Sequence, residues 1–149
     1  MEMTKQVYKI EQVFIEEEAP LYRILTPFDV KDFAKGKIGN NASESLLVMC
    51  LDTKNRVIAY SEVFKGSLNQ STAHPREIFL FAILNNSARI ALAHCHPSGV
   101  AKPSENDEYF TKRIMEASDL LGIELIDHVI VTRTDDYHSF REEGIINNQ

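Results

Sequence analysis

Three short and nearly unbroken apolar runs constrain what this chain can fold into. They are ESLLVMCLD, RIALAHCH and IELIDHVIVT, at residues 44–52, 89–96 and 123–132. Apolar runs of this length between polar ends are typical of β-strands that are covered on both faces. Strand-like and helical segments alternate through the second half of the chain, which predicts an α/β layered domain with a mixed β-sheet.

The segments around these runs carry start and stop signals for further elements. The turn sequence DTKN separates the first run from a second strand-like segment, RVIAYSEVF, so residues 46–64 are predicted to form a hairpin. Residues 6–14 are compatible with an additional strand. Three helices are expected, one capped by Thr26 and closed by Gly36 and Gly39, one starting at Pro75, and the longest running from Ser104 to Gly122.

The composition is that of one globular domain spanning residues 1–149, with 44% apolar and 26% charged residues. A formal charge of −6 disfavours broad binding to phosphate backbones. Lys31, Lys35 and Lys37 are interpreted as a solvated helix face. Because there is no signal-peptide core and no run long enough to span a membrane, we expect a cytoplasmic protein. The only cysteines, Cys50 and Cys95, lie in apolar runs, and no disulfide is expected.

The stretch HCHPSGVAKPSEND, at residues 94–107, concentrates groups that bind metal ions. Side chains alternate on an extended chain, so His94 and His96 point to the same side of the strand end. If Ser104 caps the following helix, Asp107 is its third residue and directs its carboxylate back toward the strand end. Zinc in hydrolytic sites is commonly held by three histidine and carboxylate ligands, with a fourth position left for water. His94, His96 and Asp107 can supply such a set.

A structural interpretation of the same residues stays open. The S-x-x-D step formed by Ser104 and Asp107 is also an ordinary capping pattern, and H-x-H pairs arise by chance. His74 is predicted to be a cap or turn residue and His138 an exposed loop residue, neither with a catalytic role. His128 is interpreted as a core histidine outside the site, with a supporting contact to the site as the alternative.

The stretch resembles the metal motif of the JAB/JAMM metallopeptidase superfamily, through its pattern H-x-H-P, six residues, S-x-x-D. The flanking sequences LDTKNRVIAYSEVFKGSLNQSTAHPREIF and LLGIELIDHVIV are similar to the RadC-like subfamily, over about residues 41–144. The resemblance implies the cytidine-deaminase-like architecture of that superfamily. Two features depart from the subfamily pattern. Cys95 stands where Asn is usual, at a position that faces away from the ligands, and 149 residues leave no room for the helix-hairpin-helix segment of full-length members.

The resemblance also implies a role for each residue of the site. The two histidines and the aspartate of the motif correspond to zinc ligands. Glu44, just before a buried strand, corresponds to the base that serves the zinc-bound water and its hydroxide, and Ser104 to a donor for the oxyanion of the tetrahedral intermediate. From the residues alone Glu62 and Glu77 compete with Glu44, and only the resemblance selects Glu44.

The expected function is therefore a zinc-dependent hydrolase of the JAB/JAMM type, a metallopeptidase or isopeptidase with a peptide or protein substrate. The alternative, suggested by the RadC name, is a DNA-repair accessory or nucleic-acid-processing protein. The acidic balance and the missing helix-hairpin-helix segment count against it. A binding module that keeps a metal site without catalysis is a further alternative. A cytidine deaminase is set aside because the H-x-E and P-C-x-x-C signatures are missing.

Overall fold

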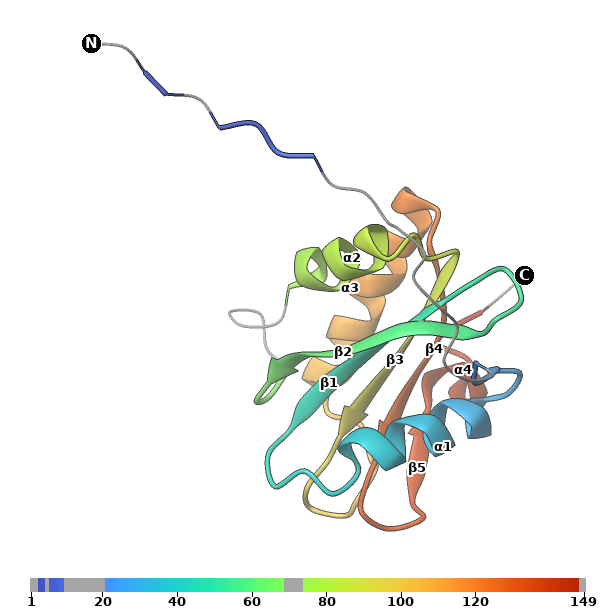
Figure 1. Cartoon of the computed structure of the whole chain (residues 1–149). Coiled ribbons are helices and arrows are strands. Elements are labelled where there is room, and N and C mark those ends of the chain that lie inside the picture. The colour runs from blue at the N-terminus through green and yellow to red at the C-terminus, as the bar shows by residue number, and fades with distance from the viewer. Residues whose placement is uncertain (1–2, 5, 10–20, 69–73, 148–149) are drawn as a thin grey trace.

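The structure is a computed structural model that describes residues 3–4, 6–9, 21–68 and 74–147 (Figure 1). A five-stranded sheet carries helices on both faces, which confirms the predicted α/β layered domain with a mixed sheet. The elements in chain order are α1 (Pro27–Ile38), β1 (Ser45–Leu51), β2 (Val57–Lys65), α2 (Pro75–Leu84), β3 (Arg89–Cys95), α3 (Glu105–Leu121), β4 (Glu124–Val131), β5 (Tyr137–Ser139) and α4 (Phe140–Glu143).

The strands are ordered β2-β1-β3-β4-β5 across the sheet. β1 pairs antiparallel with β2 and with β3, β3 pairs parallel with β4, and β4 pairs antiparallel with β5. The antiparallel pair β1 and β2 confirms the predicted hairpin. The parallel pair β3 and β4 is joined by α3, which crosses one face of the sheet between them, as a parallel connection requires.

Alternate residues of the central strands belong to two different cores. On the face covered by α2 and α3 the core includes Leu46, Val48, Cys50, Ile90 and Leu92, and on the face covered by α1 it includes Leu47, Met49, Leu51, Ala93 and Cys95. This alternation explains why β1 and β3 are almost wholly apolar, since every side chain except that of Arg89 is buried on one face or the other. Cys50 and Cys95 are both free thiols.

Most of the predicted helix boundaries are confirmed, including the start of α2 at Pro75 and the end of α1 at Gly39, and one is wrong. Thr26 and Ser104 each form a capping box at a helix start, and Gly122 ends α3 with φ 71°, in the left-handed region that favours glycine. Gly36, expected to help close the first helix, instead lies inside α1, which continues to Ile38. The buried residues of α1 pack on the sheet and offset the small cost of an internal glycine.

Two predictions near the chain ends need correction. The strand expected over residues 6–14 is not formed at residues 6–9, and residues 10–14 lie outside the described residues. His138 is not in an exposed loop but in β5, where its Nε2 lies 2.7 Å from Glu143 Oε2. The pairing of β5 with β4 is a tertiary contact, and the sequence of a three-residue polar segment does not predict it. No helix in the described part of the chain is long and apolar enough to cross a membrane.

A buried carboxylate on β4 fastens the segment that contains β5 and α4. Asp127 accepts hydrogen bonds from Ser139 Oγ at 2.6 Å, from the Arg141 backbone N–H at 3.1 Å and from the His128 backbone N–H at 2.7 Å. Burial disfavours the charged carboxylate more than these donors favour it, and it raises the pKa of Asp127 to about 6.

The raised pKa of Asp127 predicts a pH-dependent contribution to folding stability. A carboxyl group whose folded-state pKa is raised stabilises the fold at pH values below its unfolded pKa of about 3.9, and this stabilisation is lost as pH rises through about 6. Between pH 5 and pH 7.5 the wild-type protein should lose about 1 kcal/mol of unfolding free energy relative to Asp127→Asn. Urea unfolding of both proteins across this range measures the difference. Parallel pH curves for the two proteins would contradict the prediction.

Candidate metal centre

Three segments meet at one end of the sheet, two of them consecutive in the sequence and the third about fifty residues earlier. His94 lies at the end of β3, Asp107 lies in the first turn of α3, and Glu44 immediately precedes β1. The antiparallel register pairs Leu46 with His94, so Glu44 lies beside the chain as it leaves β3 toward His96. The strand order thus brings Glu44 to the motif across fifty residues of sequence.

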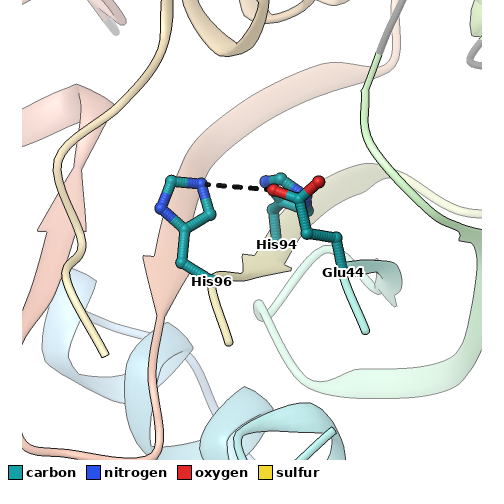
Figure 2. A group of neighbouring side chains, drawn as sticks. All are labelled: Glu44, His94 and His96. Carbon is teal, nitrogen blue, oxygen red and sulfur yellow. Dashed lines mark ion pairs between the residues drawn. The ribbon is translucent and has the colours of Figure 1, made fainter. Parts of the chain in front are cut away.

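Four side chains contact one another at this end of the sheet. Glu44 Oε1 lies 3.7 Å from His94 Nε2 and 3.9 Å from His96 Nε2, and Figure 2 shows its carboxylate turned toward the two rings. Asp107 lies 3.5 Å from His94 Nδ1 through Oδ1 and 3.1 Å from His96 Nε2 through Oδ2. Two ligand atoms of one tetrahedral zinc ion are about 3.3 Å apart, given metal–ligand distances of about 2.0–2.1 Å. The observed separations run from 3.1 to 3.9 Å, and those on either side of His94 are alternatives, because one ion binds a single nitrogen of that ring.

His94 is the most constrained residue of the group. It is fully buried, and neither of its ring nitrogens has a hydrogen-bond partner among the described residues. A buried polar group without a partner is costly, so such an atom calls for an explanation. Burial lowers the pKa of His94 and keeps the ring neutral, with a lone pair to offer. Its nitrogens, together with imidazole and carboxylate donors close by, fit the coordination chemistry of zinc.

The orientation of His96 is fixed by a backbone contact. Its Nδ1 lies 3.0 Å from the carbonyl oxygen of Val100, which can only accept, so Nδ1 carries a proton and Nε2 faces Asp107. The hydrogen bond with Asp107 raises the pKa of His96. Burial alone would raise the pKa of Asp107, but the hydrogen bonds from His96 and the Ser104 backbone outweigh burial and lower it. A metal ligand is commonly oriented in this way through its second ring nitrogen.

The structure adds a second candidate for the carboxylate ligand. Glu44, His94 and His96 each offer a ligand atom, and these atoms lie within 4.8 Å of one another. Asp107, the predicted ligand, faces Nδ1 of His94, whereas Glu44 faces Nε2 of the same ring. A metal ion bound to Nδ1 of His94 would therefore lie beside Asp107, and one bound to Nε2 would lie beside Glu44. Glu44, predicted as the base, is placed well for either role.

Ser104 and the competing glutamates lie where their local structure places them. Ser104 caps α3, accepting from the Asp107 backbone N–H at 3.0 Å, while its own backbone N–H donates to Asp107 Oδ2 at 2.9 Å. Glu62 is an exposed residue of β2 that accepts from Asn41, and Glu77 is an exposed residue of α2 near Arg76. Neither glutamate belongs to the histidine group described above.

Some contacts to the site carry no signal in the sequence. Thr111 Oγ1 donates to the Asp107 carbonyl at 2.8 Å and lies 2.6 Å from His128 Nδ1, so His128 donates to Thr111. Both earlier interpretations of His128 thus have a basis, because it is a fully buried core residue that also braces the first turn of α3. The Val100 carbonyl and Ser67, which donates to Glu44, are likewise invisible to motif analysis.

Comparison with known sequences decides the family. The sequence profile of the RadC-like JAB domain matches residues 24–145. The chain belongs to the RadC-like JAB domain family. The match confirms the resemblance drawn from the motif and extends it from about residue 41 to residue 24.

Several curated proteins similar to this RadC-like JAB domain carry the name UPF0758 protein. One from Clostridium beijerinckii is 44% identical over 124 residues, which cover 83% of this chain and 54% of the relative. One from Enterococcus faecalis is 52% identical over 101 residues, covering 68% and 43%. One from Methanosarcina barkeri is 37% identical over 135 residues, covering 91% and 58%. The chain spans about half the length of these relatives.

Proposed function

We propose that this RadC-like JAB domain is a zinc-dependent hydrolase that cleaves a peptide or isopeptide bond. The observation that carries the proposal is the fully buried imidazole of His94, with both nitrogens unpaired and each facing a carboxylate. A cation bound to one of these nitrogens would give it a partner, while the other nitrogen carries the ring proton and faces the remaining carboxylate. Membership of the JAB family supports the same chemistry.

Each residue of the group has a distinct part in the proposed reaction. A bound zinc ion would supply a Lewis acid and lower the pKa of a water molecule toward about 7. In the proposal His94, His96 and Asp107 hold the ion. Glu44, whose side chain is partly open to solvent, takes a proton from the attacking water and passes it to the leaving amine. Ser104, exposed at the start of α3, donates to the developing oxyanion.

The cellular location is part of the same proposal. We assign the reaction to the cytoplasm, where thiols such as Cys50 and Cys95 stay reduced.

The basic residues of α1 do not support the nucleic-acid alternative. Lys35 pairs with Asp135 at 3.0 Å, and the ammonium groups of two further lysines lie over aromatic rings.

Metal analysis of the purified protein tests the proposal. The wild-type protein is expected to hold one zinc ion, and His96→Ala and Asp107→Ala are each expected to lower zinc affinity at least 100-fold, because each removes a ligand. Zinc content is measured after dialysis against a weak chelator, together with cleavage of a panel of peptide and isopeptide substrates. Stoichiometric zinc in both variants would remove the proposal.

Ser104→Ala is expected to separate capping from catalysis. Loss of an N-cap hydroxyl costs about 1 kcal/mol of stability, whereas loss of an oxyanion donor lowers turnover by about 10²-fold or more. Thr26→Ala is the matched control, because Thr26 forms the same kind of capping box on α1, away from the metal-centre residues. Both variants should melt at similarly reduced temperatures, and only Ser104→Ala should lose turnover. Equal turnover in the two variants would leave Ser104 with a capping role alone.

A further inference from the structure

The two residues that follow β2 each contact the proposed base. Ser67 Oγ donates to Glu44 Oε2 at 2.5 Å, and the Gly66 backbone N–H donates to the Glu44 carbonyl at 2.7 Å. The first contact holds the carboxylate and the second holds the backbone of the same residue. Glu44 is therefore fixed at both ends by two consecutive residues that follow β2.

Ser67 is itself held between two anchored neighbours. Gly66 has φ 106°, a left-handed conformation that favours glycine and turns the chain back toward Glu44. On the other side Leu68 is 2% exposed and belongs to the core beneath α2 and α3. Because both neighbours are fixed, the Ser67 hydroxyl is presented to Glu44 without the entropic cost of ordering a free loop.

The division of labour between the two carboxylate oxygens follows from this arrangement. Oε2 of Glu44 is occupied by Ser67, which leaves Oε1 facing His94 at 3.7 Å and His96 at 3.9 Å. Glu44 precedes β1 and its side chain is 28% exposed, so packing alone does not select one rotamer. A hydrogen bond from a hydroxyl group to a carboxylate is strong and directional, and it selects the rotamer that points Oε1 at the imidazoles.

We propose that Ser67 is a positioning residue that aims the Glu44 carboxylate at the His94 and His96 pair. The inference rests on the proposed function, since it assigns Ser67 a task in the same reaction. In this scheme Ser67 acts on the reaction through Glu44. The segment after β2 is thereby part of the working site.

The test compares Ser67→Ala with Ser67→Thr, which keeps the hydroxyl, and with Ser61→Ala, an equally small change within β2. Ser67→Ala should lower kcat about tenfold with little change in KM and with unaltered zinc content. Ser67→Thr should restore most of kcat, and Ser61→Ala should behave as wild type. In a Glu44→Gln background, Ser67→Ala should have no further effect on kcat, because the group that it positions can no longer act.

A second readout needs neither metal nor substrate. The carboxyl ¹³C NMR signal of Glu44, assigned by its loss in Glu44→Gln, should shift or broaden in metal-free Ser67→Ala and keep its wild-type position in Ser67→Thr. An unchanged signal and unchanged kcat in Ser67→Ala would overturn the inference while leaving the hydrolase proposal intact. Absence of zinc and of turnover in the wild-type protein would overturn both.

Discussion

Glu44→Gln is expected to retain stoichiometric zinc and to lose turnover by about 10²- to 10⁴-fold, the range associated with loss of a general base. The amide has nearly the shape of the carboxylate and can still accept from Ser67, so the side chain should stay in place. It cannot take up a proton, and this difference alone should stop the reaction. Zinc content and kcat, measured on one preparation, separate the two effects.

The same variant decides between the two carboxylates of the metal centre. If Glu44 rather than Asp107 is the ligand, Glu44→Gln should lose zinc and Asp107→Ala should keep it, and the assignment of base and ligand would have to be exchanged. Glu62→Gln is the matched control, since Glu62 was a competing candidate but accepts from Asn41 on the exposed side of β2. Loss of turnover in Glu62→Gln would contradict the assignment of Glu44.

Phe140→Ala is expected to lower the unfolding free energy by about 3–5 kcal/mol. Phe140 is fully buried at the start of α4. Its ring stacks on the His128 ring with 4.9 Å between the ring centroids, and it packs edge-to-face with the His138 ring at a centroid distance of 5.0 Å. Removal of the ring opens a cavity between β4, β5 and α4, and the backbone pairing around it limits collapse. Urea unfolding monitored by circular dichroism measures the loss.

Phe28→Ala supplies the matched control for Phe140→Ala. Phe28 is 54% exposed on α1, where its ring lies under the Lys31 ammonium group. Because little of its surface is removed from water on folding, truncation should cost less than about 1 kcal/mol. Similar losses in the two variants would show that the Phe140 cavity refills and that this corner of the core is soft.

Much of the fold follows from local patterns in the sequence. The runs that became β1, β3 and β4 can be recognised in the sequence because both faces of these strands are buried, so most of their side chains are apolar. The sequence predicts α3 equally clearly, because Ser104 marks its start and Gly122 marks its end. The sequence does not predict β5 and α4, because elements of three and four residues are too short to show an apolar periodicity. They are stabilised by pairing with β4 and by hydrogen bonds to Asp127.

The residues of the candidate site likewise fall into those that local sequence patterns predict and one that they do not. His94, His96, Ser104 and Asp107 lie within fourteen residues, so strand alternation and helix capping were enough to place them near one another. Glu44 required either a family resemblance or the β1–β3 register, because nothing in its neighbourhood distinguishes it from other strand-edge glutamates.

The amino-acid order alone determined the buried strands, the capped helix after the motif and the pair of imidazoles on one side of a strand end, because each depends on neighbours within a few residues. Only the tertiary structure brought Glu44 opposite the histidines, Ser67 onto Glu44 and Thr111 between His128 and Asp107. These contacts join residues from different elements, and their geometry is set by sheet order, register and side-chain packing. Such quantities arise when the whole chain buries its apolar surface, and no short segment encodes them.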